Sequence, residues 1–420
     1  MSRPTWEVAD ILNRYGAAYT AQHALPAYQL RLMCAIQLCR TCVLGGHLER
    51  CGHCDRQRIG YNSYRNRHCP KCQNPARAQM RLLLLRPMRL LLLRQWIEQR
   101  KGDLLPIDYY HVVFTIPEQL NPLALQNKAV FYKLLFATTA ATLQTIARDP
   151  KHLGAEIGFF SILHTWGQAL THHPHIHCVV TGGGLSAVVQ ELKAHYHSRW
   201  IHCKPGFFLS VRVLSRLFRR LFLEALQQAF DKQKLSFKGG LDGLAQPKAF
   251  RDLTAPLRKC EWVVYAKPPF GGPRQVVEYL GRYTHRVAIS NQRLLNVDNG
   301  QVTFQYKQYR TEDRQKARQM TLSADEFIRR FLLHSLPPGF QRIRHYGLLA
   351  SRGKLANLTL CRQHLNAPPA VPSPAAGTKA AVKAQLLEPV LRCPQCLTGV
   401  MVRIRFYAST TGLPRPVDTS

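Results

Sequence analysis

The chain has 420 residues, of which 46% are hydrophobic, and its 58 lysine and arginine residues against 24 acidic residues give a formal net charge of +34. A charge of this size concentrates polyanions around the protein, so nucleic acid is the expected partner. A membrane-surface protein would need an amphipathic helix with a clean basic face, and a ribosomal protein is rarely this long or this rich in cysteine, so both classes are set aside.

The N-terminal sequence MSRPTW lacks the apolar stretch of a signal peptide. The most apolar run, residues 82–93, is interrupted by Arg86, Pro87 and Arg89, well short of the roughly 20 residues that a membrane span needs. We therefore expect a cytoplasmic protein with no membrane partner. Its thirteen cysteines are then expected to bind metal rather than to form disulfides.

Residues 1–100 are predicted to form a helical zinc-binding domain. Apolar residues recur at helical spacing in residues 5–45, which predicts two helices. Cysteines and turn formers follow between Cys39 and Cys72, and residues 75–99 are again typical of a helix, with a kink or break at Pro87.

Residues 101–350 are predicted to form an α+β domain with a largely antiparallel central sheet, because strands and helices are interspersed. The expected strands are residues 109–115, 158–163, 175–181 and 261–267, and the expected helices are residues 123–147, 210–230 and 275–283. The three glycines at residues 182–184 predict a turn. Asn299 and Gly300 predict a hairpin turn between strands at residues 286–290 and 301–306.

Residues 351–420 are predicted to form a C-terminal linker and basic tail. Beyond residue 366 the chain is rich in alanine, proline, lysine and serine, which is typical of a linker. A lone pair, Cys393 and Cys396, follows. With Cys361 it forms half of a zinc ribbon, or else its members are free thiols.

Two cysteine pairs near the N-terminus have the spacing of a structural zinc site with four thiolate ligands. Cys51 and Cys54 are separated by fourteen residues from Cys69 and Cys72. Each pair can form one knuckle of a tetrahedral site, which predicts that all four bind one Zn²⁺. Cys39 and Cys42 are candidates for a second zinc, together with one of the histidines His47, His53 and His68.

A third candidate metal site consists of histidines. In the stretch PHIHCVV at residues 174–180, strand alternation places His175 and His177 on one face and Ile176 on the other. His164 follows the apolar strand at residues 158–163 and reaches the same place if the two strands pair. These three imidazoles are predicted to bind a catalytic divalent metal and to leave positions for phosphate oxygens, while His172 and His173 remain possible substitutes for His164.

Tyr279 and Tyr283 are predicted to share one face of a helix, because they lie four residues apart. Two phenols beside a metal site could act as nucleophiles toward DNA phosphate. Arg282, Arg286 and Lys267 are close enough in sequence to bind DNA and to stabilise a phenolate. The alternative is that both tyrosines are ordinary core aromatics of an amphipathic helix.

Several stretches together resemble the rolling-circle insertion-sequence transposases of the IS91 family. They are LHTWGQ at residues 163–168, HPHIH at 173–177, YLGRYTHR at 279–286 and RIRHYG at 342–347. Residues 62–72 resemble the N-terminal zinc-binding region of that family, although a cysteine is expected where Tyr64 stands. The resemblance covers roughly residues 10–350.

The resemblance implies an HUH endonuclease fold, in which the strand with His175 and His177 lies in the central sheet and the tyrosine helix packs over it. It also implies Mg²⁺ or Mn²⁺ at these histidines, Tyr279 and Tyr283 as nucleophiles, and 5′-phosphotyrosine intermediates. The expected partners are single-stranded and hairpin DNA at the ends of a mobile element, and target DNA. The sequence leaves the oligomeric state open.

Two alternatives remain at this point. A replication initiator or relaxase of the same HUH class would share the active site. A zinc-dependent DNA-binding regulator would have purely structural histidines and would perform no catalysis.

Overall fold

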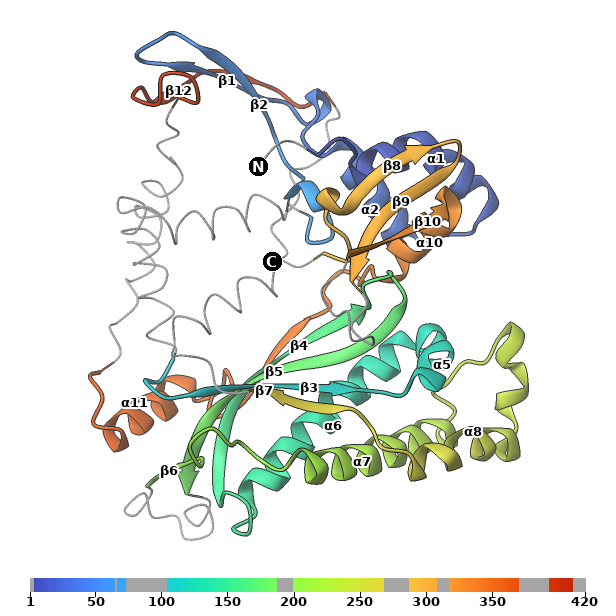
Figure 1. Cartoon of the computed structure of the whole chain (residues 1–420), viewed down its shortest axis with the longest axis vertical. Coiled ribbons are helices and arrows are strands. Elements are labelled where there is room, and N and C mark those ends of the chain that lie inside the picture. The colour runs from blue at the N-terminus through green and yellow to red at the C-terminus, as the bar shows by residue number, and fades with distance from the viewer. Residues whose placement is uncertain are drawn as a thin grey trace.

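The structure is a computed structural model that describes residues 4–64, 66–72, 104–186, 199–267, 287–307, 317–369 and 393–410. Within these ranges the strands form three separate sheets. Figure 1 shows a six-stranded sheet with long helices beside it, a lobe that combines three helices with a three-stranded sheet, and a second three-stranded sheet that projects beyond them. Helices and antiparallel sheets confirm the predicted α+β class.

The six-stranded sheet is antiparallel wherever two of its strands pair. Its order is β11-β4-β5-β3-β7, and β6 pairs with β5 outside this path. The strands are β3 (Tyr109–Thr115), β4 (Ala155–Trp166), β5 (His172–Ser186), β6 (Trp200–His202), β7 (Val264–Lys267) and β11 (Ile343–Gly347). The predicted central antiparallel sheet is therefore present.

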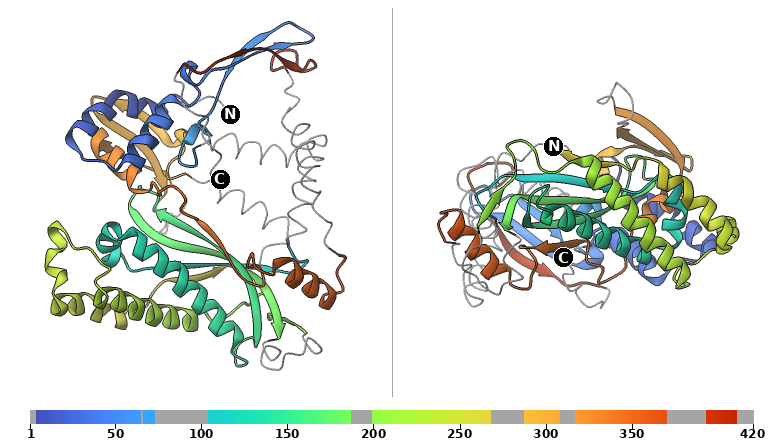
Figure 2. Two further views of the ribbon diagram at one scale, coloured as in Figure 1. Left: turned by 180° about the vertical axis from the view of Figure 1, so that it is seen from behind. Right: turned by 90° about the horizontal axis from the view of Figure 1, so that it is seen from below.

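Helices cover one face of this sheet, as the view from below shows (Figure 2). They are α5 (Asn121–Gln126), α6 (Lys128–Arg148), α7 (Val211–Asp231) and α8 (Pro247–Lys259). In α7, Leu214, Phe218 and Phe222 recur every fourth residue and are fully buried. Ile176 and Cys178 of β5 belong to the same core. Strand alternation therefore directs His175 and His177 to the opposite face of the sheet, away from the helices.

The N-terminal helices share a second core with a segment from much later in the chain. Helices α1 (Val8–Gln22) and α2 (Ala27–Leu38) pack with α10 (Ala324–Leu333) and with a sheet of order β10-β9-β8. The side chain of Gln29 donates to the carbonyl oxygen of Leu332 at 3.1 Å. This core joins segments that the predicted boundary at residue 100 places in different domains.

The hairpin of this lobe has the predicted turn but a different first strand. β8 (Leu294–Asp298) and β9 (Gln301–Lys307) flank a two-residue turn in which Asn299 and Gly300 have φ of 46° and 71°. A two-residue turn of this kind joins two strands directly, so the first strand of the hairpin is β8. The prediction of a strand at residues 286–290 is wrong. The third strand, β10 (Ala317–Ser323), pairs with β9.

The predicted turn at residues 182–184 is also wrong, because these glycines lie inside β5. A Cβ atom on Gly184 would lie 2.1 Å from the carbonyl oxygen of Glu156. A Cβ atom on Gly183 would lie 2.4 Å from that of Ile201. The glycines therefore allow close approach of the neighbouring strands β4 and β6.

The third sheet has the order β12-β1-β2 and joins the two ends of the chain. β1 (Gly46–Cys51) and β2 (Gln57–Tyr61) form a hairpin, and β12 (Met401–Tyr407) pairs antiparallel with β1. Residues 351–420, predicted as linker and tail, thus supply this strand and the helix α11 (Lys354–His364).

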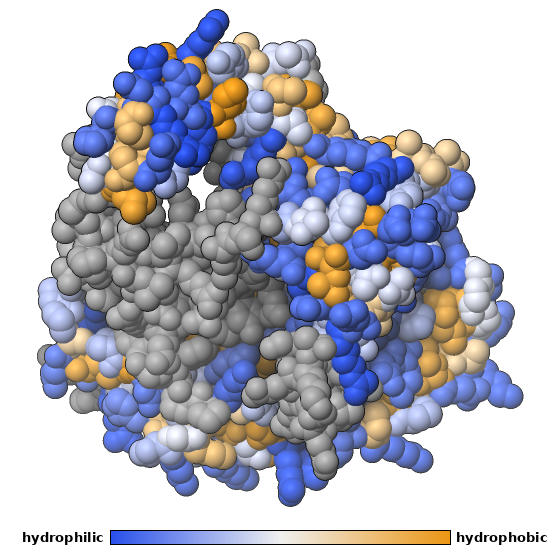
Figure 3. Space-filling view, turned by 45° about the horizontal axis from the view of Figure 1, so that its top comes forward, coloured by the Kyte–Doolittle hydropathy of each residue, from blue (hydrophilic) through white to orange (hydrophobic). Residues whose placement is uncertain are grey.

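Hydrophilic residues dominate the described surface in the space-filling view, and apolar residues there occur in small patches (Figure 3). In the part of the chain that the structure describes, no helix combines the length and the apolar character that crossing a membrane requires.

Candidate active site

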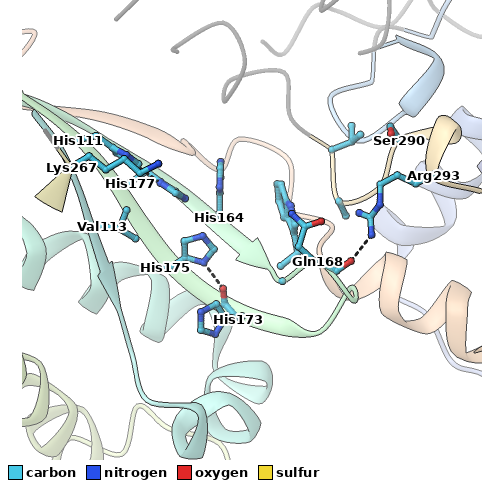
Figure 4. Close-up of a pocket in the computed structure, with 14 residues that line it drawn as sticks. His111, Val113, His164, Gln168, His173, His175, His177, Lys267, Ser290 and Arg293 are labelled. Atoms are coloured by element: carbon cyan, nitrogen blue, oxygen red, sulfur yellow. Dashed lines mark hydrogen bonds between the residues drawn. The ribbon is translucent and has the colours of Figure 1, made fainter. Parts of the chain in front are cut away.

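Three imidazoles converge on the face of the central sheet that lies opposite α6 and α7 (Figure 4). β4 pairs antiparallel with β5, so that His164 lies directly opposite His175, and Ile162 opposite His177. One ligand nitrogen from each of His164, His175 and His177 lies within 4.8 Å of the others. The strand pairing thus brings together the three histidines that the sequence predicts as metal ligands.

Hydrogen bonds to the Nδ1 atoms orient two of these rings. Nδ1 of His175 lies 2.7 Å from the carbonyl oxygen of His173, to which it can only donate. Nδ1 of His177 lies 2.9 Å from Nε2 of His111 on β3. A histidine that binds a metal through one nitrogen commonly donates the other N–H in this way. The Nε2 atoms of His175 and His177 are therefore the natural metal ligands.

His111 is suited to accept the hydrogen bond from His177. It is 3% exposed, and burial, aided by the nearby charge of Lys267, lowers its pKa to about 3. A neutral imidazole has one nitrogen that can accept a hydrogen bond, and His111 needs such a nitrogen if His177 is the donor. The rings of His111 and His177 are also stacked, with centroids 5.1 Å apart.

A cavity of about 510 Å³ lies in front of the histidines, between the central sheet and residues 287–293, which precede β8. Lys267 and Arg293 contribute cationic side chains to its lining. The guanidinium of Arg293 donates to the carbonyl oxygens of Gln168 and Gln305. The site therefore combines three nitrogens that could bind a metal ion with positive charge, and both features are suited to a phosphate group.

Four predicted site residues, Tyr279, Tyr283, Arg282 and Arg286, lie outside the described residues. The described chain stops at Lys267 and resumes at Val287, and both of these residues line the cavity. Both ends of the gap that contains the two tyrosines therefore lie at the cavity.

The two possible substitutes for His164 are not in the cluster. His172 is buried on the helix side of β5, where its Nε2 lies 3.2 Å from the hydroxyl of Tyr132. His173 lines the cavity and fixes the ring of His175 through its carbonyl oxygen.

The four cysteines predicted to share one zinc do not come together. Cys51 and Cys54 cluster with Cys393 and Cys396, whereas Cys69 and Cys72 cluster with Cys39. The reason is the β1–β2 hairpin, in which Gly46 pairs with Tyr61 and Arg50 with Gln57. Cys51 and Cys54 lie at the tip of the hairpin, whereas Cys69 follows its base. Five residues of strand span about 17 Å, so the hairpin keeps the two cysteine pairs too far apart to share one ion.

The second predicted zinc set is corrected as well. Cys39 joins Cys69 and Cys72, with its sulfur 3.3 Å from that of Cys72, but Cys42 is exposed and belongs to neither cluster. Nε2 of His47 lies 3.0 Å from the carboxylate of Glu49, and Nε2 of His68 accepts a hydrogen bond from the backbone of Leu336. His53 is likewise outside the cysteine clusters.

The sequence alone did not identify His111 or Arg293 as site residues. His111 lies in a correctly predicted strand, but only the pairing of β3 with β5 reveals that it faces His177. Arg293 is one of 58 lysine and arginine residues, so the sequence does not distinguish it from the others. It lies at the cavity because the fold places the segment before β8 there.

Comparisons with known proteins identify related transposases. The family described as "Putative transposase" matches residues 158–356, and the "Transposase zinc-binding domain" matches residues 11–84. The chain is 54% identical to "Putative transposase y4qJ" of Sinorhizobium fredii over the full length of both chains. It is 29% identical to "Transposase for insertion sequence element IS801" of Pseudomonas savastanoi pv. phaseolicola, over 78% of this chain and 70% of that protein.

No solved structure matches the chain. The relative with full coverage and the two matching domains nevertheless define the family. The zinc-binding domain and the cysteine clusters also support structural zinc. The chain belongs to the IS91 family of transposases.

Proposed function

We propose that this transposase cuts and rejoins single-stranded DNA at the ends of a mobile element, through 5′-phosphotyrosine intermediates formed by Tyr279 and Tyr283. The observation that carries the proposal is the convergence of His164, His175 and His177 on a cationic cavity. Rolling-circle transposition is the process that such a reaction would serve.

The histidines fit a catalytic divalent metal. Their ligand nitrogens lie close enough for one ion, and hydrogen bonds hold two of the rings in the required orientation. When bound, Mg²⁺ or Mn²⁺ would polarise the scissile phosphate and withdraw charge from it. Transition ions such as Mn²⁺ suit three imidazoles better than Mg²⁺ does.

Covalent geometry limits how far the nucleophiles can lie from the cavity. Tyr283 is four residues from Val287, which lines the cavity, and four residues span at most about 14 Å. Tyr279 is eight residues from Val287, a span of at most about 28 Å. These short separations from the cavity lining support a role for both tyrosines at the histidine site.

In the proposed reaction, the phenol oxygen of one tyrosine attacks the phosphorus, and the bond from phosphorus to the 3′ oxygen breaks. The phenol proton is lost, the 3′ oxygen leaves as a free hydroxyl, and the 5′ end is esterified to the tyrosine. Ionising a phenol at neutral pH costs about 4 kcal/mol, which the positive charge of Lys267 and Arg293 can partly offset. The ester keeps the energy of the phosphodiester, so rejoining by the reverse attack needs no ATP.

The first experiment is an adduct assay with the full-length protein and labelled single-stranded DNA from an element end. We expect Mn²⁺ or Mg²⁺ to produce a covalent protein–DNA species that survives boiling in detergent. A chelator should prevent it, and Mn²⁺ without added zinc should restore it. A regulator without catalysis would instead give a salt-sensitive complex and no covalent species under any of these conditions.

His111 is expected to position His177 rather than to contact the substrate. Replacing His111 by leucine removes the acceptor for Nδ1 of His177, and the affinity for Mn²⁺ should fall about 10- to 100-fold. His111→Gln keeps an acceptor oxygen and should recover part of this loss. Isothermal titration with Mn²⁺ measures both variants. Equal affinities in the wild type and the leucine variant would exclude the positioning role.

A further inference from the structure

Four cysteines from opposite ends of the chain form one cluster. Cys51 and Cys54 lie at the tip of the β1–β2 hairpin, and Cys393 and Cys396 precede β12. The sulfur of Cys51 lies 3.7 Å from that of Cys396, and the sulfur of Cys54 lies 3.5 Å from that of Cys393. Four thiolates around Zn²⁺, at a Zn–S distance of about 2.3 Å, have sulfur atoms about 3.8 Å apart. The observed separations therefore approach those of a tetrahedral zinc site.

Both cysteine pairs have the backbone geometry of a zinc knuckle. The backbone N–H of His53 donates to the sulfur of Cys51 at 3.4 Å. The backbone N–H of Gln395 donates to the sulfur of Cys393 in the same way, also at 3.4 Å. The N–H of Gly399 lies 3.3 Å from the sulfur of Cys396. These donors stabilise negative charge on sulfur, the form in which cysteine binds zinc.

Gly399 leaves space for this cluster. A Cβ atom at this position would lie 2.4 Å from the sulfur of Cys51 and 3.3 Å from that of Cys396. Contacts below 3.0 Å require one partner to move. The glycine thus allows the backbone before β12 to approach the sulfur of Cys51.

The sheet around the cluster has very little hydrophobic core of its own. The buried residues of its hydrophobic cluster in the described chain are Cys51, Cys393 and Met401. Phe406, Val402 and Ile404 of β12 are 73%, 52% and 43% exposed. Small β-sheets of this kind are marginal in water without a further source of stability, and a metal ion is a common one.

We propose that Cys51, Cys54, Cys393 and Cys396 bind a Zn²⁺ ion that joins the two ends of the chain and holds β12 against β1. This site is separate from the cluster of Cys39, Cys69 and Cys72. Its C-terminal half lies outside both matched domains, which end at residues 84 and 356. The proposal is independent of the catalytic mechanism, because it concerns a different set of ligands.

The test is the zinc content of the full-length protein, measured by elemental analysis after removal of free metal. We expect the variant Cys393→Ser/Cys396→Ser to contain one zinc per chain fewer than the wild type. The matched control is Cys34→Ser/Cys260→Ser, which changes two exposed cysteines that belong to neither cluster and should retain the full zinc content. An unchanged zinc content in the Cys393/Cys396 variant would overturn the proposal.

A second variant leaves all the cysteines in place. Gly399→Ala should also lose one zinc, whereas Gly243→Ala, where a Cβ atom meets nothing within 4 Å, should lose none. Hydrogen exchange gives an independent readout, since amides of β12 should exchange faster in Gly399→Ala than in the wild type, while those of β3 keep their protection. Slow exchange of β12 in a protein that has lost the zinc would show that the metal does not hold the strand, and would overturn the proposal.

Discussion

Replacement of both Tyr279 and Tyr283 by phenylalanine is expected to abolish the covalent DNA adduct, with a loss of at least about a thousandfold in the rate of strand cleavage. Phenylalanine keeps the ring but lacks the oxygen that forms the phosphate ester. The proposed metal ligands are other residues, so Mn²⁺ affinity should not change. The measurement is the adduct yield over time with labelled single-stranded end DNA.

The single variants distinguish the two nucleophiles. Each should lose at least one cleavage or transfer step, and peptide mapping of the adduct in the wild type shows which tyrosine carries DNA. Tyr265→Phe is a suitable control, because Tyr265 is an exposed tyrosine on β7. Full cleavage by the double variant would refute the assignment of these residues, even if the family assignment stands.

Replacement of His177 by alanine is the second change for which we expect a large effect. His177 lies between the other members of the site, with its ring centroid 4.4 Å from that of His164 and 4.8 Å from that of His175. Loss of this ligand should weaken metal binding and lower the cleavage rate by at least about a thousandfold, because polarisation of the phosphate depends on the ion. Isothermal titration with Mn²⁺ and the adduct assay measure the two effects.

The control is His152→Ala, which removes an exposed imidazole in the turn between α6 and β4. It should keep both metal affinity and cleavage. Thermal unfolding of His177→Ala establishes that the fold survives. If this variant cleaves DNA at the rate of the wild type, the histidines are structural and the catalytic metal lies elsewhere.

Much of the central domain could be predicted because its information is local. The strand at residues 109–115 has the bounds of β3, and the helix expected at residues 210–230 is α7 within one residue at each end. Alternation along β5 correctly opposes His175 and His177 to Ile176, since a strand with one buried face fixes the direction of each side chain. The position of His164 beside His175 could be predicted because it depends only on the antiparallel pairing of two strands that are neighbours in sequence.

The cysteine partners could not be predicted in the same way. All four CxxC pairs have the same local spacing, so the prediction depended on the separation between pairs, and the fourteen residues between Cys54 and Cys69 are typical of a zinc site. The hairpin of β1 and β2 keeps those pairs apart, and β12 brings in a partner from 339 positions away. His111 was missed for a related reason, because its neighbour in space is set by sheet order rather than by sequence.

The pairing of β1 with β12 has a consequence for the synthesis of this transposase. Cys51 leaves the ribosome 345 positions before Cys396, a delay of roughly 20 to 70 s at ordinary rates of translation. During this interval the early cysteines lack their final partners, while Cys69 and Cys72 are already available nearby in the chain. A chain truncated before Cys393 would leave Cys51 and Cys54 without the cysteines that they meet in this structure. The complete sheet of β12, β1 and β2 can therefore form only after translation has passed residue 407.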